Sequence, residues 1–167
     1  MDYGPKLLAV ARNEIGNAES PLGSNLGPDI VKYKKFTWLD PFDPWPWCQA
    51  FANYTIEKVI GKVPIETGAV EGLWDYAGTD QPYFKRFRRG EEIPRNGDFV
   101  MLSKDGRDFT HITIKDGARY LGGNQGHKVQ YSDYSDSSIW GYVRLVDDGV
   151  ADPPAKPKPP KFEVTVQ

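Results

Sequence analysis

The spacing of apolar residues changes once along this chain, and that change restricts the folds open to it. Before Asp98 apolar residues recur at helical spacing, and from Asp98 onward they alternate with polar residues, as in β-strands. The first pattern predicts helices over residues 5–17, 28–36, 48–60 and 68–76. The second predicts strands over residues 98–103, 110–115, 119–123, 128–132 and 140–145. Helices followed by an antiparallel β-meander make an α+β fold.

The chain has 167 residues, enough for one globular domain, and 39% of them are hydrophobic, which supplies a core. Residues 151–161 are rich in proline and lysine and predict a polyproline-type linker, and residues 162–166 alternate like one short strand. We therefore divide the chain into a domain over residues 1–147 and a Pro/Lys-rich linker or tail over residues 148–167.

Charge and hydropathy exclude several classes of function. The formal net charge of −2 shows no basic excess of the kind that nucleic-acid binders carry. The apolar run at residues 7–11 is too short to cross a bilayer or to form the apolar region of a secretory signal. We expect a soluble monomer without nucleic-acid or membrane partners and without a standard export signal.

Cys48 is the single cysteine of the chain, so an internal disulfide is impossible and a cysteine-based zinc site is not expected. It follows a loop, residues 37–47, in which three prolines exclude regular structure, and it begins the predicted helix 48–60. Unpaired backbone N–H groups and the helix dipole at such a position favour a reactive thiolate. The alternative is a small buried core cysteine, a common fate of this residue type.

His111 is the candidate for a base that takes the proton of Cys48. It lies near the start of the predicted strand 110–115, where its imidazole can face the helix that begins with Cys48. At the end of the next strand, Asn124 is the first choice for an amide that orients the imidazole, and Gln125 is the rival. The ordinary alternatives are a histidine satisfied within a half-buried strand and polar residues of a turn.

Several short motifs, in one order along residues 5–145, resemble those of a known family. They are Asn13-Glu14-Ile15-Gly16, Pro46-Trp47-Cys48, Asn96-Gly97-Asp98, Thr110-His111-Ile112, Leu121-Gly122-Gly123-Asn124-Gln125 and Gly141-Tyr142-Val143-Arg144. Together they resemble the cysteine, histidine-dependent amidohydrolase/peptidase (CHAP) domains and their NlpC-like relatives, a group of small bacterial and phage cell-wall hydrolases. Thr110 and Thr113 depart from the glycines that this family has beside its histidine.

The resemblance implies a papain-like α+β fold for residues 1–147, with the nucleophile at a helix N-terminus packed on the antiparallel sheet. It implies hydrolysis of amide bonds in the peptide part of peptidoglycan, as an endopeptidase or an amidase, through a triad of Cys48, His111 and Asn124. Cys48 would attack the carbonyl carbon, His111 would act as base and then acid, and the Cys48 N–H would help bind the oxyanion. This chemistry needs no metal or other cofactor.

Trp45 and Trp47 are expected to line the substrate groove, together with Gln125, because aromatic faces pack well on sugars and peptide stems. The alternative for both tryptophans is core filling or loop anchoring, and for Trp74 the core is the expectation. A basic cluster further along the chain is expected to form a solvated face. Its members are Lys85, Arg86, Arg88 and Arg89.

Two other functions remain open at this point. A thiol acyltransferase or deamidase can use the same triad, because only the acceptor of the acyl group differs. A non-catalytic wall-binding module would use the tryptophans and leave Cys48 inert. For the hydrolase, the missing export signal fits a phage or bacterial lysin that is released to the wall, carried on a virion or delivered by a secretion system.

Overall fold

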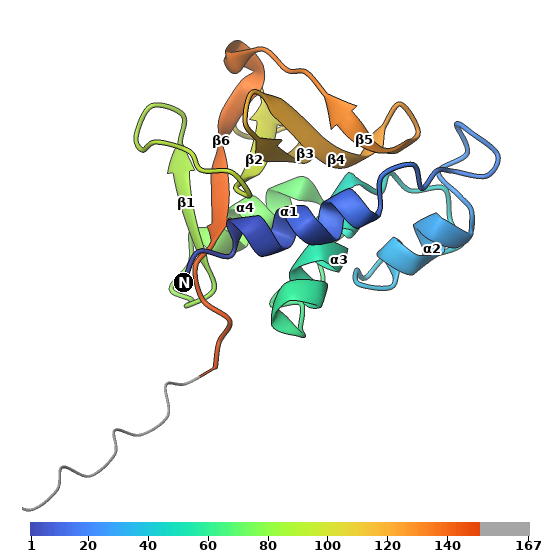
Figure 1. The fold of residues 1–167 in the computed structure, drawn as a ribbon, viewed down its shortest axis with the longest axis horizontal. Helices are drawn as coiled ribbons and strands as arrows, with labels where there is room; N and C mark the ends of the chain where they lie inside the picture. The colour runs from blue at the N-terminus through green and yellow to red at the C-terminus, as the bar shows by residue number, and fades with distance from the viewer. Residues whose placement is uncertain (151–167) are drawn as a thin grey trace, which may run out of the picture.

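The computed structural model describes residues 1–150, and helices lie against one face of a six-stranded sheet (Figure 1). The helices are α1 (Gly4–Asn13), α2 (Pro28–Lys34), α3 (Cys48–Ile60) and α4 (Val70–Ala77). The strands are β1 (Phe84–Arg88), β2 (Phe99–Ser103), β3 (Phe109–Asp116), β4 (Arg119–Gln125), β5 (Lys128–Ser132) and β6 (Ile139–Leu145), with a short 3₁₀ helix, η1 (Asp136–Ser138), before β6. Within this part of the chain no helix is both long and apolar enough to cross a membrane. The expected linker over residues 151–161 and strand over 162–166 lie outside the described residues.

The sheet confirms the predicted α+β class. Its strand order is β1-β6-β2-β3-β4-β5, and every neighbouring pair is antiparallel. Strands β2 to β5 form the expected meander, and β6 returns across the sheet to pair with β2. The strand pattern did not predict β1, because only Phe84 and Phe87 of this edge strand are fully buried and basic residues stand between them.

The basic cluster on and after β1 forms a largely solvated face, as expected, since Lys85, Arg86 and Arg89 are exposed and Arg88 is half-buried. Two of its arginines also contact the protein. The Nη1 of Arg86 donates to the carbonyl oxygen of Trp74 at 2.9 Å, and its guanidinium lies over that indole. In the same way, the Nε of Arg88 donates to the carbonyl oxygen of Trp140 at 2.8 Å. These contacts attach the edge strand to α4 and to β6.

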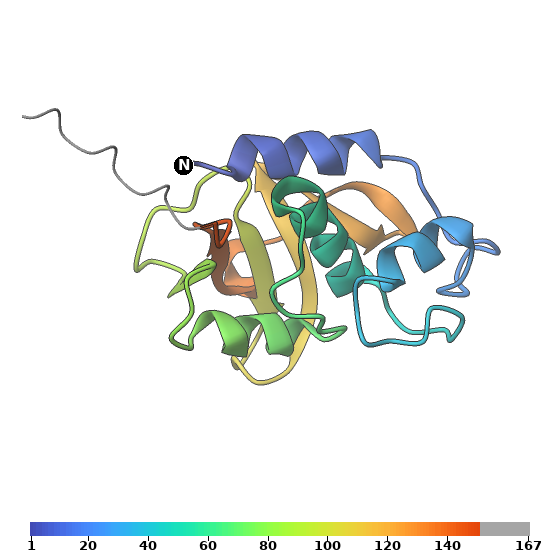
Figure 2. The ribbon, with the colours of Figure 1, turned by 90° about the horizontal axis from the view of Figure 1, so that it is seen from below.

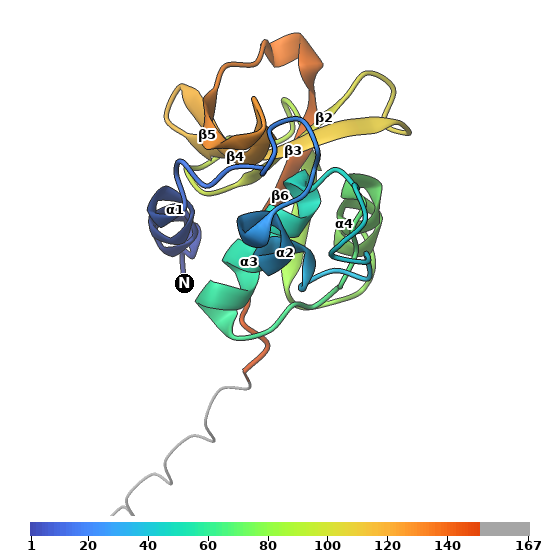
Figure 3. The same cartoon turned by 90° about the vertical axis from the view of Figure 1, so that its right-hand side faces the viewer.

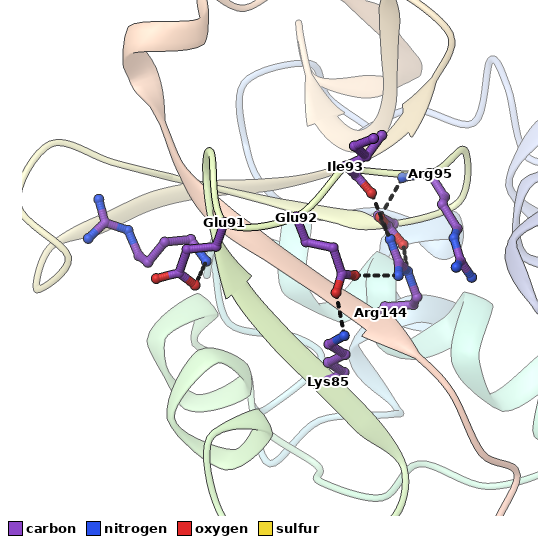
Figure 4. Close-up of polar contacts among 8 residues, drawn as sticks. Lys85, Glu91, Glu92, Ile93, Arg95 and Arg144 are labelled. Carbon is purple, nitrogen blue, oxygen red and sulfur yellow. Dashed lines mark hydrogen bonds and ion pairs between the residues drawn. The ribbon is translucent and has the colours of Figure 1, made fainter.

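The aspartate of the Asn96-Gly97-Asp98 motif has a structural role in the polar network around Arg144 (Figure 4). Both oxygens of Asp98 bind Arg144 on β6, with the Nε–Oδ1 and Nη2–Oδ2 distances each 2.8 Å. The Nη1 of Arg144 also binds Glu92 at 2.7 Å, and Lys85 on β1 binds the other oxygen of that carboxylate. A buried, two-pronged contact of this kind is oriented far better than an exposed ion pair. It links β1, β6 and the segment that leads into β2.

Helix α3 lies between α1 and α4 and against the sheet (Figures 2 and 3). Every residue from Cys48 to Ile56 is buried, as expected for a helix enclosed on all sides. A Cβ atom built at Gly123 of β4 would lie 2.6 Å from the Cβ of Phe51, so the helix and the sheet touch at this glycine. This close approach brings the first turn of α3 beside β3 and β4.

Candidate active site

Cys48 is the first residue of α3, and its surroundings favour a thiolate. Among the described residues no side chain caps this helix end, so its backbone N–H groups are free to face an anion. The backbone N–H groups of Gln49 and Ile112 act to lower the pKa of the Cys48 thiol. The side chain is only 8% exposed, which excludes most water from the sulfur.

The loop that leads to Cys48 is fixed by two buried side chains of α2. Trp47 is fully buried and stacks on Tyr33, with ring centroids 5.7 Å apart. The Nζ of Lys34, also fully buried, donates to the carbonyl oxygens of Asp43 at 2.6 Å and Asn25 at 2.7 Å. Because both anchors are inside the protein, the position at which α3 begins is set by packing.

His111 on β3 faces the sulfur of Cys48, and the two groups shift each other's pKa. Burial acts to raise the pKa of the Cys48 thiol, but the hydrogen bond and the charge of His111 outweigh burial, so the pKa lies below its ordinary value. Burial acts to lower the pKa of His111, but the hydrogen bond and the charge of Cys48 outweigh it, and the pKa is raised. Both shifts favour a thiolate beside an imidazolium.

Gln125, at the end of β4, holds the other side of the imidazole. Its Oε1 lies 2.9 Å from the Nε2 of His111. Its Nε2 donates to the carbonyl oxygens of Tyr120, at 3.2 Å, and of Gln130. Because the amide nitrogen faces two carbonyl oxygens, the amide oxygen faces the imidazole, and the Nε2 of His111 must be the donor. The Nδ1 of His111 is then the nitrogen left to exchange a proton with Cys48.

In the structure Gln125 contacts His111. The rival candidate for the orienting amide therefore takes this place, and Asn124, the first choice, does not. Asn124 has a φ of 58°, in the left-handed region, where β4 departs from regular pairing with β5. The expected substrate contact of Gln125 is also not found, because its side chain is buried and both ends of its amide bind the protein.

A cleft of about 310 Å³ opens beside Cys48. Its lining includes the exposed indoles of Trp38 and Trp45, the start of α4, and Phe109 and Thr110 of β3. Trp45 lines this cleft, and its contact with substrate stays a prediction. A larger apolar hollow of about 480 Å³, between α2 and the loop around Phe42, includes neither Cys48 nor His111.

Trp47 and Trp74 lie in the core, and Trp38 joins Trp45 at the cleft. Trp47 does not reach the cleft, because it is buried under the loop and anchors it. Trp74 is in the core, as expected, with its ring centroid 5.9 Å from that of Phe109. Trp38 was not singled out, although it stands in the same proline-rich segment, 37–47, as Trp45.

The sequence analysis missed Tyr134, which lies between β5 and η1. Its ring centroid is 5.7 Å from that of His111, and its hydroxyl group donates to the Oε1 of Gln125 at 3.0 Å. The one available signal was a single aromatic residue in a stretch of serines and aspartates, residues 132–138. Nothing in that pattern says that the segment folds back onto His111.

His127, the second histidine, lies away from this site. It is largely exposed, as expected, and its Nδ1 is 3.3 Å from the Oε2 of the buried Glu19. Within residues 1–150 no group of three or more histidine, cysteine, aspartate or glutamate side chains is arranged to hold a metal ion.

The fold of the chain is similar to that of a known protein domain. Neither a family model nor a curated protein matches the chain. Among solved structures, the chain is similar to the NlpC/p60 domain of the peptidoglycan hydrolase SagA, with a TM-score of 0.53 and 20% identity. The match covers 85% of this chain and 98% of that one. The likeness confirms the papain-like α+β fold, and the resemblance to CHAP and NlpC-like domains as a family stays a prediction.

Proposed function

We propose that the domain over residues 1–147 is a peptidoglycan hydrolase that cleaves amide bonds of the wall peptide through Cys48. The observation that carries the proposal is the alignment of Cys48, His111 and Gln125 at the N-terminus of α3, beside an open cleft with aromatic walls. The NlpC-like fold supports it, because the similar structure is a domain of a peptidoglycan hydrolase.

The chemistry begins with the thiolate of Cys48, which attacks the carbonyl carbon of the scissile amide and forms a C–S bond. The oxyanion of the tetrahedral intermediate accepts the backbone N–H of Cys48 at the uncapped helix end. His111 then gives a proton to the leaving amine as the C–N bond breaks, which leaves a thioester. A water molecule, deprotonated by His111, attacks the thioester, and the carboxylic acid product leaves as Cys48 is released.

In this proposal Gln125 orients the imidazole of His111, and Asn124 has no catalytic role. Its fixed amide oxygen accepts the Nε2–H of His111, so that Nδ1 faces Cys48 in the neutral imidazole and donates in the imidazolium. Nδ1 is therefore the ring nitrogen through which both proton transfers take place.

The cleft supports a substrate with an exposed peptide stem. Trp38 and Trp45 offer faces on which an alkyl chain or a sugar can pack. An endopeptidase and an amidase both fit this surface. The proposed place of action is the cell wall, which a lysin reaches after release from the cell or as part of a virion.

The test is digestion of purified sacculi, with mass spectrometry of the released fragments. The wild type runs beside Cys48→Ala and His111→Ala, and His127→Gln is the matched control because it changes the other histidine. Fragments that only the wild type and the control release support the proposal, and their masses name the bond that is cut. Fragments that carry a transferred amine support the acyltransferase. Sedimentation with the wall without any release overturns hydrolysis and supports the binding module.

A further inference from the structure

Tyr134 contacts two of the three proposed active-site residues from outside the sheet elements that carry them. Its hydroxyl group is 3.0 Å from the Oε1 of Gln125. Its ring lies at 41° to the imidazole of His111, with centroids 5.7 Å apart, and packs edge-on against Tyr120. The segment between β5 and η1 thus reaches His111 and Gln125, and Tyr134 is not among the residues that line the cleft of Trp38 and Trp45.

The hydroxyl group of Tyr134 completes the hydrogen bonds of the Gln125 amide. The Oε1 accepts from His111 and from Tyr134, while the Nε2 donates to two carbonyl oxygens of the neighbouring backbone. A half-turn of the amide would place its oxygen against those carbonyl oxygens, so this orientation is the one that satisfies all four contacts. A buried amide with every bond made is held more rigidly than one with a free lone pair.

Tyr134 remains a donor at neutral pH. Burial raises the pKa of its phenol, the hydrogen bond with Ser132 opposes that rise, and the negative charge of Cys48 adds to it. The net rise keeps the hydroxyl group protonated under the conditions in which a thiolate and an imidazolium form. The hydroxyl group contacts Gln125, the ring lies beside the imidazole of His111, and Tyr134 does not line the cleft beside Cys48.

We propose that Tyr134 is a positioning residue, which holds the Gln125 amide through its hydroxyl group and the His111 ring through its aromatic face. This inference rests on the proposed thiol chemistry of Cys48. It assigns a function to the β5–β6 connection, in which one aromatic side chain supports His111 and Gln125.

The test compares Tyr134→Phe, Tyr134→Leu and Tyr142→Phe. Phenylalanine keeps the ring and removes the hydroxyl group, and leucine removes both. Tyr142 is the matched control because it is a buried tyrosine of the same apolar cluster, stacked on Phe87, and it does not touch His111 or Gln125. The readouts are the rate of Cys48 alkylation by iodoacetamide against pH, kcat and KM on sacculus fragments, and the melting temperature.

We expect Tyr134→Phe to lower kcat about threefold to tenfold, the equivalent of one net hydrogen bond, with little change in KM. The apparent pKa of Cys48 in the alkylation profile should rise, because a less firmly held imidazole stabilises the thiolate less. Tyr134→Leu should show both effects more strongly, and Tyr142→Phe should show neither.

Three outcomes overturn the inference. The first is a Tyr134→Phe variant with the kcat and the alkylation profile of the wild type. The second is a Tyr134→Phe variant that loses only melting temperature, which assigns the residue to packing. In the third, wild-type Cys48 alkylates no faster than a free thiol, and the proposed function falls together with the inference. The two proposals can also be separated. If wild-type Cys48 alkylates rapidly but no wall peptide is hydrolysed, the hydrolase is rejected. If the pKa of Cys48 is then still raised in Tyr134→Phe, the positioning role of Tyr134 is supported.

Discussion

The Nε2 of His111 lies 2.9 Å from the Oε1 of Gln125, although 14 residues separate them in the chain. The contact spans two neighbouring strands of the sheet, β3 and β4, and it fixes which imidazole nitrogen faces Cys48. The sheet therefore positions His111 and Gln125 relative to each other. Several measurable consequences follow from this pair and from the groups around it.

Gln125→Ala should lower kcat by on the order of tenfold to a hundredfold, because the imidazole loses the acceptor that fixes its tautomer. Asn124→Gly should leave kcat within about twofold, and glycine also tolerates the left-handed backbone at this position. Steady-state rates on sacculus fragments decide between the two amides. A large loss in Asn124→Gly with little loss in Gln125→Ala would return the orienting role to Asn124.

The reactivity of Cys48 should have two pH limits. The lowered pKa of the thiol means that the thiolate persists at lower pH, and the raised pKa of His111 means that the imidazolium persists at higher pH. Turnover should fall as pH drops through the first value, where the thiolate is protonated, and as pH rises through the second, where the proton donor is lost.

Alkylation with iodoacetamide measures the first limit without a substrate. Wild-type Cys48 should titrate below the value of about 8.5 of a free thiol, and His111→Ala should move it upward. His127→Gln should keep the wild-type profile. A wild-type profile that matches a free thiol would leave Cys48 as an inert core residue.

The fold was predictable from the sequence because helical and alternating spacing are strong signals where an element has one buried face. The edge strand β1 was not, because Lys85 and Arg86 are exposed between its two buried phenylalanines and the run reads as a charged surface. The fold also depends on Gly123, whose missing side chain lets α3 touch β4, and no spacing rule shows such a contact.

The site was predictable in part. Cys48 and His111 follow from a helix start and a strand start, which are positions that periodicity locates. The choice between Asn124 and Gln125 does not follow, because β4 loses regular pairing with β5 between Gly122 and Gln125, and alternation cannot be counted through that irregularity. Tyr134 reaches the site through the path of a connecting segment, which tertiary packing alone determines.

Trp45→Ala should raise KM on sacculus fragments about fivefold to tenfold, because an exposed aromatic wall of the cleft is lost while Cys48 is untouched. Phe42→Ala is the control, since this side chain is exposed on the same loop but lines the separate apolar hollow. Trp47→Ala should instead lower the melting temperature, because a buried ring is removed. Equal KM values for Trp45→Ala and Phe42→Ala would place the substrate elsewhere.

Gly123→Ala tests whether contact between α3 and the sheet aligns Cys48 with His111. The added methyl group would meet the Cβ of Phe51 at 2.6 Å and the indole of Trp47 at 2.8 Å, so the helix must move away from β4. We expect a loss of about 1–3 kcal/mol in the free energy of unfolding, measured by denaturant titration. Cys48 alkylation at neutral pH should also slow, because the distance to His111 increases.

The control for this substitution is Gly61→Ala, at the other end of the same helix. Gly61 has a φ of 77° with open space around it, so alanine there strains the backbone by about 1 kcal/mol and leaves the site in place. Gly61→Ala should therefore lose stability and keep the wild-type alkylation rate, while Gly123→Ala loses both. If the two variants alkylate at the same rate, the pairing of Cys48 and His111 tolerates a shift of α3, and close packing on β4 serves stability alone.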